Sequence, residues 1–124
     1  MNARTLELPA IGQPFEGGIY AGITLDGDQR AALILLPGDE EKPHAEALAW
    51  ATEQGGVLPS RIDMLVLFEN GKTKGKFERT WYWTGQEYAG NADYAWIQLV
   101  GYGSQSYGHK SGDYRCRAVR RVAI

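Results

Sequence analysis

The sequence contains very little of what a disulfide-stapled or metal-centred protein needs. Its 124 residues include one cysteine, Cys116, and two histidines, His44 and His109. A single cysteine cannot form an intrachain disulfide, and these three residues are too few for a Cys/His zinc site. Apolar packing must therefore hold the core, and a hydrophobic content of 44% is enough for that. We expect neither a cofactor nor a bound metal.

The sequence also lacks an export signal and long apolar runs. Positions 1–8 (MNARTLEL) lack the apolar core of a signal peptide. The apolar run 31–36 (AALILL) is far too short to span a bilayer. The sequence therefore predicts a protein without membrane insertion that is made in the cytoplasm.

Catalytic motifs are absent as well. No G-x-S-x-G elbow exists, and only His44 and His109 could act as the base of a Ser-His-acid triad. Gly71-Lys72-Thr73 resembles the end of a phosphate-binding loop, but Val66 stands where the first glycine would be. We interpret the chain as a protein that is not an enzyme.

Charge is distributed unevenly along the chain, although the net charge is −2. Residues 1–70 carry 4 basic and 11 acidic residues, and residues 71–124 carry 9 basic and 4 acidic residues. Because the basic residues are scattered, we interpret the two parts as complementary halves of one fold and expect no nucleic-acid partner. A face that binds polyanions would require five cations to gather on it: Lys72, Lys74, Lys76, Arg79 and Lys110.

The pattern of strands, then helices, then strands predicts a single α+β domain over residues 1–124. Strands are expected at 17–25 and 30–36, joined by a turn at Gly27-Asp28. A first helix should open at Pro43 and end before Gly55-Gly56.

The second helix has the clearest start signal in the chain. Ser60 and Asp63 form an S-x-x-D pattern that resembles a capping box, and Asn70-Gly71 should end the helix. The lysine-rich stretch 72–76 is expected to be an exposed loop.

The C-terminal part alternates like strands. Strands are expected at 80–84, 94–100 and 114–122, with the polar and aromatic stretch 105–109 between the last two. In the last strand one face should hold Tyr114, Cys116, Ala118 and Val122, and the other Arg115, Arg117, Val119 and Arg121. Cys116 is then a small core residue rather than a nucleophile.

Four phrases in this order are similar to one known family. They are EALAWATEQGGVLPSR (46–61), WYWT (81–84), DYAWIQ (93–98) and YRCRAVRR (114–121). Together they resemble the C-terminal domain of Lcl-type bacterial collagen-like adhesins, which recurs in phage and prophage proteins. The resemblance covers about residues 17–122.

The resemblance implies a C-type-lectin-like fold, with two helices flanking antiparallel sheets and the N- and C-terminal strands paired. A loop-rich second sheet would carry the ligand surface. The triplets Glu-Pro-Asn, Gln-Pro-Asp and Trp-Asn-Asp of calcium-dependent lectins are missing, so calcium-dependent sugar binding is not expected. The family is associated with trimeric adhesins. We expect self-association into a homo-oligomer, because the chain has more apolar and aromatic residues than one small core needs.

The ligand face is predicted on the loops and strands between Gln86 and Lys110. The stretch 102–110 (YGSQSYGHK) has the Tyr, Ser, Gly and Gln content of adaptable binding loops. Trp83 and Trp96 should support this region from beneath. The residues expected to contact the ligand are Tyr88, Tyr102, Gln105, Tyr107, His109 and Lys110. The alternative, a solvent-exposed hairpin without a ligand, stays open.

A second set of polar residues, Glu87, Asn91 and Asp93, could supply oxygen ligands to a hard cation. We favour the interpretation that this is a polar hairpin loop, in which Asn and Asp serve turn geometry.

The missing catalytic residues and the resemblance together predict a non-catalytic ligand-binding module of phage or prophage type. It would recognise a host-surface glycan or protein, on a virion that lysis releases from the host-cell cytoplasm. The alternative is a small intracellular phage protein that binds and modulates a host protein. The two hypotheses differ in location, since the first places the protein in purified particles and the second only in lysate.

Overall fold

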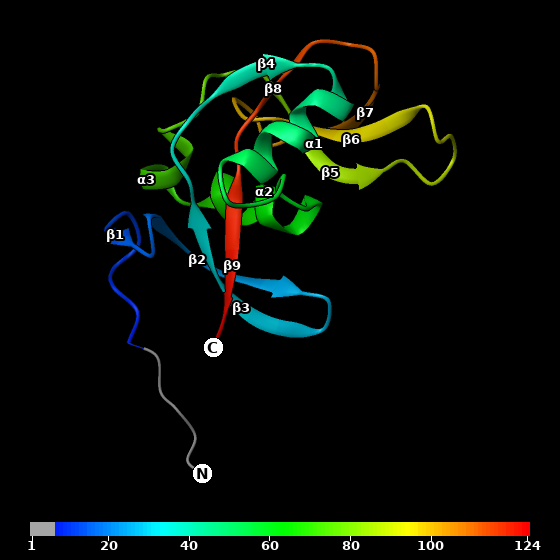
Figure 1. The fold of residues 1–124 in the computed structure, drawn as a ribbon. Helices are drawn as coiled ribbons and strands as arrows, with labels where there is room; N and C mark the ends of the chain where they lie inside the picture. Colours follow the sequence, from blue (N-terminus) through cyan, green and yellow to red (C-terminus); the bar gives the residue numbers. More distant parts are fainter. Residues whose placement is uncertain (1–6) are drawn as a thin grey trace.

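The computed structural model describes residues 7–124, which form an α+β fold (Figure 1). The α+β class expected from the sequence is therefore confirmed. The helices of the described residues are α1 (His44–Glu53), α2 (Arg61–Glu69) and α3 (Gly71–Lys74). The strands are β1 (Pro14–Phe15), β2 (Gly18–Asp26), β3 (Gln29–Leu35), β4 (Glu40–Lys42), β5 (Trp81–Glu87), β6 (Tyr94–Leu99), β7 (Gln105–His109), β8 (Tyr114–Cys116) and β9 (Val119–Ala123). None of these helices is long and apolar enough to cross a membrane.

The first sheet has the strand order β1-β2-β3-β9. β2 and β3 form the predicted hairpin about Gly27-Asp28, with Asp26 paired to Gln29. The C-terminal strand β9 runs antiparallel to β3. Pairing between the N- and C-terminal parts of the chain is thus present, but the partner of β9 is β3 rather than the first long strand, β2.

The second sheet has the order β4-β8-β5-β6-β7. β5, β6 and β7 are successive antiparallel strands, and β8 joins β5 in parallel through Tyr82 and Arg115. The β5–β6 hairpin projects from one side of the molecule, and α3 lies on the opposite side (Figure 1). Helix α2 contacts β2 of the first sheet as well as β5 and β6 of the second.

Two apolar cores lie on the two faces of β5. Trp83 is fully buried in one core, and Trp81 packs against the same core, so these two tryptophans share a face as predicted. Tyr82 points the other way, into a core that also contains Met64 and Leu67 of α2. The alternation of β5 therefore fixes which side of the second sheet α2 occupies.

The predicted strand 114–122 is wrong as one element, because it divides into β8 and β9 in different sheets. Between them Arg117 is buried, and its guanidinium donates to the carbonyl oxygens of Leu36 and Lys76 at 2.9 and 2.6 Å. One of the predicted faces, with Tyr114, Cys116, Ala118 and Val122, does pack into the Trp83 core. The opposite face is not solvent-exposed as a whole, since Val119 is fully buried in the Met64 core.

The stretch 72–76 is also not the exposed loop that we expected, and the helix count rises from two to three. Asn70 caps α3 by accepting a hydrogen bond from the Lys72 amide at 2.8 Å. Thr73 is buried, and its hydroxyl donates to the Leu67 carbonyl oxygen at 2.6 Å. The Asn70 cap and the buried Thr73 hydroxyl thus order this segment as a short helix, although its lysines alone would indicate an exposed loop.

Candidate ligand-binding site

Aromatic residues of β6 and β7 gather on one face of their hairpin. Tyr94 lies opposite His109, and Trp96 lies opposite Tyr107. Because side chains alternate along a strand, these four residues share a face. Tyr88, directly after β5, completes the group. We call this set the aromatic strip: Tyr88, Tyr94, Trp96, Tyr107 and His109.

The rings of the aromatic strip pack closely against one another. Tyr88 and Tyr107 are stacked, with ring centroids 4.0 Å apart and planes inclined by 16°. Tyr94 meets Tyr107 edge-on at 5.8 Å and His109 edge-on at 5.2 Å. Trp96 meets Tyr88 edge-on at 5.4 Å. Each such pair contributes about 0.5–1.5 kcal/mol beyond the burial of its area, so the strip is a stiff surface.

Tyr107 is the most open member of the tyrosine stack. It is 47% exposed, while Tyr88, Tyr94 and Trp96 are half-buried. One end of the strip is covered by Arg61, whose guanidinium carbon lies 3.5 Å from the centroid of a Trp96 ring. An aromatic face with a cation at one end and a histidine at the other is therefore presented to solvent.

The opposite face of the hairpin is fixed to the body of the protein. Ala95 and Ile97 are buried in the Trp83 core. At Gly108 a side chain is excluded, since a Cβ would lie 2.6 Å from the ring of Tyr114. The glycine thus allows the ring to seat directly on the strand backbone. Core packing on this side holds the aromatic strip in place on the other.

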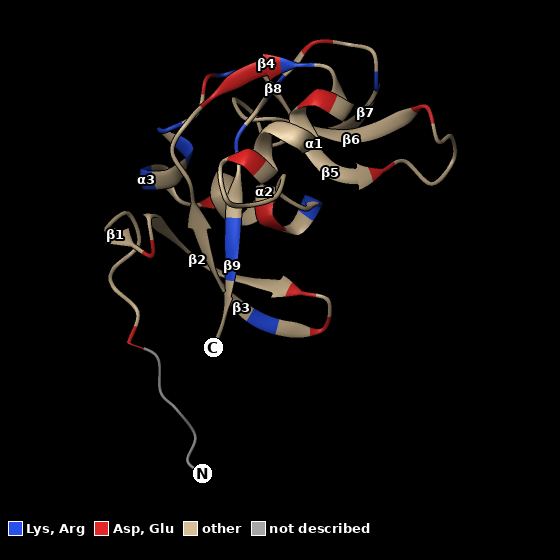
Figure 2. Cartoon of the chain, in the orientation of Figure 1, with Lys and Arg blue, Asp and Glu red and all other residues tan. Residues whose placement is uncertain are grey.

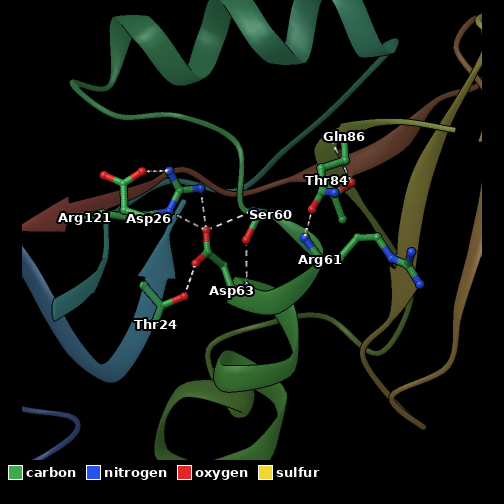
Figure 3. A network of polar contacts seen from close by, with 8 residues as sticks. All are labelled: Thr24, Asp26, Ser60, Arg61, Asp63, Thr84, Gln86 and Arg121. Carbon is green, nitrogen blue, oxygen red and sulfur yellow. Dashed lines mark hydrogen bonds and ion pairs between the residues drawn. The ribbon is translucent and has the colours of Figure 1, made fainter. Parts of the chain in front are cut away.

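A chain of hydrogen bonds positions Arg61, and Figure 3 shows the part of it that joins Arg61, Gln86 and Thr84. The Arg61 backbone amide donates to the side-chain oxygen of Gln86 at 2.6 Å. The Gln86 backbone amide donates to the Thr84 hydroxyl at 3.2 Å, and that hydroxyl donates to the Trp96 carbonyl oxygen at 2.8 Å. The start of α2 is therefore tied to the backbone of the residue whose ring it covers.

The same figure shows how α2 itself is anchored. Ser60 and Asp63 form the predicted capping box, so this expectation is confirmed. Asp63 is also fully buried and accepts two hydrogen bonds from the Arg121 guanidinium, at 3.0 and 2.7 Å. Thr24 donates its hydroxyl to the other carboxylate oxygen. This ion pair could not be predicted from the sequence, because 58 residues separate its partners and no local pattern marks it.

Gln105 differs from the expectation of an outward-pointing side chain. Its amide nitrogen donates to the carbonyl oxygen of Arg61 at 3.0 Å and to the side-chain oxygen of Gln98 at 2.7 Å. Its amide oxygen accepts from the Arg61 guanidinium at 3.0 Å. Gln105 therefore helps to hold Arg61 in place. The prediction that its side chain points outward to contact a ligand is wrong.

Tyr102 lies apart from the other predicted contact residues. It is 77% exposed and belongs to the turn between β6 and β7. Tyr94 stands at the far end of β6, about 17 Å of extended strand from Leu99, after which the turn that holds Tyr102 begins. The structure thus joins Tyr88, Tyr107 and His109 in one strip and leaves Tyr102 outside it.

Lys110 and His109 are each engaged by a neighbour. The Lys110 ammonium lies 2.6 Å from the Glu87 carboxylate, and this hydrogen bond lowers the pKa of Glu87. Nδ1 of His109 accepts a hydrogen bond from the Ser111 amide at 3.1 Å. These contacts border the aromatic strip with polar groups on the His109 side.

The loop between β5 and β6 has the turn geometry that we favoured over a cation site. The Asn91 side-chain oxygen accepts from the Asp93 amide at 2.9 Å, and Glu87 is paired with Lys110. Within residues 7–124, no three His, Cys, Asp or Glu side chains are grouped so that they could hold a metal ion.

His44 and Cys116 lie in the core. His44 is buried edge-on to Trp83 at 4.8 Å, and its Nε2 donates to the Thr84 carbonyl oxygen at 2.9 Å. Burial lowers the pKa of His44. Burial also raises the pKa of Cys116 to about 11, so the thiol stays protonated at neutral pH. Cys116 behaves as the small core residue that we predicted.

The two oppositely charged halves of the sequence meet in ion pairs, as expected. Arg121 pairs with Asp63, and Arg115 pairs with Asp39 at 2.8 Å. The five cations do not share one face, however. The lysines of α3 lie on one side of the molecule, and the segment after β7 that begins with Lys110 lies on the other (Figure 2).

Comparison with known proteins adds no family to this picture. The sequence matches no model of a protein family and no curated protein sequence.

Proposed function

We propose that this protein is a non-catalytic ligand-binding module whose aromatic strip contacts the ligand. The observation that carries the proposal is Tyr107, which is 47% exposed although it is stacked on Tyr88 at 4.0 Å. An exposed ring that neighbouring rings already hold in place loses little conformational freedom when a ligand covers it. Large, rigid aromatic contact area of this kind is what binding surfaces use.

A glycan is the ligand that we propose for the strip. Sugar rings have a flat face of C–H groups that packs on aromatic rings, and hydroxyl groups at the edge that form hydrogen bonds. The strip offers ring faces in the middle, with the Arg61 guanidinium at one end and His109 with Ser111 at the other. A protein partner typically covers about 800 Å² per side, which is more than the five rings of the strip provide.

The resemblance to phage and prophage domains supports placing this glycan on a host-cell surface. We accordingly propose a C-type-lectin-like receptor-recognition domain carried by a virion. The competing proposal, a host intracellular protein as partner, predicts binding that free glycosides do not compete for.

The test compares two tyrosines that differ in their place in the fold. Tyr107→Ala removes the centre of the strip, and Tyr102→Ala removes an equally large ring outside it. Binding is measured by NMR titration with methyl glycosides of glucose, galactose, N-acetylglucosamine and rhamnose. An anchoring aromatic residue contributes about 2 kcal/mol, so Tyr107→Ala should weaken the best glycoside about 30-fold. Tyr102→Ala should leave its affinity unchanged.

Both variants should stay folded, because both residues lie at the surface. Tyr102→Ala should change the free energy of unfolding by no more than about 0.5 kcal/mol. Tyr107→Ala should cost about 0.5–1.5 kcal/mol through the lost stack. The proposal fails if no glycoside shifts the signals of the strip, or if Tyr102→Ala is the variant that loses binding.

A further inference from the structure

A recess lies at the opposite end of the β6–β7 hairpin from the Tyr94–His109 end of the strip. It is formed between α3, the segment that leads into β5, and the turn after β6, and it encloses about 350 Å³. This volume falls within the range of small-molecule sites. We call it the α3 recess. It does not include any residue of the aromatic strip.

The floor of the α3 recess is apolar and its walls are bare backbone. Phe77 and Val100, which are 8% and 2% exposed, form the floor. Gly71, Gly75 and Gly101 form the walls. A Cβ at Gly71 would meet no other atom within 4 Å, so the space beside this glycine is open. A ligand can therefore approach the backbone at Gly71 without meeting a side chain there.

The rim of the recess carries positive charge only. Lys74 and Arg79 line it, and no Asp or Glu does. Neither cation belongs to any ion pair of the described residues. The Lys74 ammonium lies 4.8 Å over the ring of Phe68, which holds this flexible side chain near the recess.

A third cation lies behind the floor. The guanidinium carbon of Arg117 is 5.3 Å from the centroid of the Phe77 ring, and Arg117 is only 8% exposed. Its hydrogen bonds run to carbonyl oxygens of Leu36 and Lys76, and its Nε has no partner among the described residues. A buried positive charge that no carboxylate contacts directly adds to the attraction for an anion in the recess.

We propose that the α3 recess binds a small organic anion, in which a carboxylate is attached to a flat apolar body. A hydrated inorganic anion would meet Lys74 and Arg79 but leave Phe77 and Val100 without a partner. A neutral apolar molecule would cover the floor and leave the cations uncompensated. An aromatic carboxylate satisfies both halves of the site. This ligand is separate from the glycan that we propose for the aromatic strip.

NMR titration of the whole chain with 2-naphthoate tests the ligand class. We expect the amide signals of Gly71, Gly75 and Gly101 to shift, while the signals of Tyr107 and His109 stay in place. The neutral 2-naphthamide and acetate serve as controls, since each keeps one half of the ligand. Both should bind at least about tenfold more weakly, because each loses either the ion pairs or the apolar contact. Equal affinity for naphthoate and naphthamide, or no shift at the three glycines, would overturn the proposal.

Three variants locate the site. The double substitution Lys74→Gln with Arg79→Gln should weaken 2-naphthoate about tenfold, since it removes both rim charges. Lys72→Gln is the matched control, because Lys72 lies on the same helix without lining the recess, and it should change the affinity less than about twofold. Gly71→Leu adds a large side chain to the wall of the recess and should weaken 2-naphthoate without lowering the melting temperature, since a Cβ at this position meets no other atom within 4 Å. Naphthoate binding that survives in both the double variant and Gly71→Leu would show that the recess is not the site.

Discussion

His44 is a residue whose protonation the fold opposes. It is 4% exposed, packs edge-on against Trp83, and donates from Nε2 to the Thr84 carbonyl oxygen. A carbonyl oxygen only accepts hydrogen bonds, so the neutral ring carries its proton on Nε2. A second proton would place a charge in the core, and burial accordingly lowers the pKa of His44 from its ordinary value of 6.5.

This lowered pKa predicts a loss of stability in mild acid. Below about pH 6.5 the imidazole of His44 binds a proton in the unfolded chain more readily than in the folded chain. The free energy of unfolding therefore decreases as the pH decreases. Above pH 6.5 both states hold a neutral ring and the effect disappears. Urea unfolding at a series of pH values between about 7 and 5 should show this slope. His44→Gln should flatten it and His109→Gln should not, and an unchanged slope in His44→Gln would contradict the assignment.

The tyrosines show how far residue types alone can predict a site. Composition singled out the stretch 102–110, and two of its aromatic residues, Tyr107 and His109, do lie in the aromatic strip. Tyr102 has the same chemistry and sits at the tip of a turn. What separates the two tyrosines is their register against β6, which places Tyr107 opposite Trp96. Composition carries no register, so it could not distinguish them.

Helix α2 connects the two sheets through its first turn. Its N-terminal residue, Arg61, covers Trp96 of the second sheet. Two residues later, Asp63 binds Arg121 of β9 and Thr24 of β2 in the first sheet. The capping box could be predicted because its two residues are three positions apart. The partners in the first sheet could not, since they lie far away in the sequence.

The buried carboxylate of Asp63 should therefore matter more than any surface charge nearby. Asp63→Asn leaves the Arg121 guanidinium without its buried partner, and we expect a loss of about 3 kcal/mol or more in the free energy of unfolding. Asp26→Asn is the control, because Asp26 lies 4.0 Å from the same guanidinium but its side chain is 65% exposed. That change should cost less than about 1 kcal/mol. Urea unfolding measures both, and similar losses would show that burial of the pair is not what stabilises α2.

The predicted boundaries of two segments are wrong where a buried polar contact outweighs the local sequence pattern. Alternation in 114–122 suggested one strand, but the hydrogen bonds of Arg117 occur where the chain passes between sheets. A run of lysines suggested a loop at 72–76, but Asn70 and Thr73 order α3 there. The partners of Arg117 are the carbonyl groups of Leu36 and Lys76, which are far away in the sequence, so this contact becomes visible only when the tertiary structure is known. The contacts of Asn70 and Thr73 are local, but an Asn-Gly pair indicates the end of a helix as readily as the start of the next one.

At the scale of the whole molecule, the last eleven residues form strands in both sheets. β8 pairs with β4 and β5 in the second sheet, and β9 pairs with β3 in the first. Val57 also pairs with Val119, so the connection between α1 and α2 is fastened to the same segment. The acidic N-terminal half of the sequence is thus joined to the basic C-terminal half by backbone pairing as well as by ion pairs.

Removal of β9 should consequently unfold the whole protein and not only one edge of a sheet. A chain that stops after Ala118 loses the fully buried Val119 and the Arg121 partner of Asp63. It also removes the neighbour of β3 on one side, so Leu33 and Leu35 lose their paired strand there and β3 becomes an edge strand. Loss of one large core side chain typically costs about 2–5 kcal/mol, and the buried ion pair a similar amount, which together approach the total stability of a small domain.

The measurement is the dispersion of amide signals in an NMR spectrum, together with cooperative urea unfolding. Deletion of Ile124 alone is the matched control, because this residue is 45% exposed and lies beyond β9. That chain should keep a dispersed spectrum and nearly the full free energy of unfolding, while the chain ending at Ala118 should show neither. A dispersed spectrum and a cooperative transition in the shorter chain would mean that the two cores are stable without β9, and that the Asp63–Arg121 pair is an accessory to the fold.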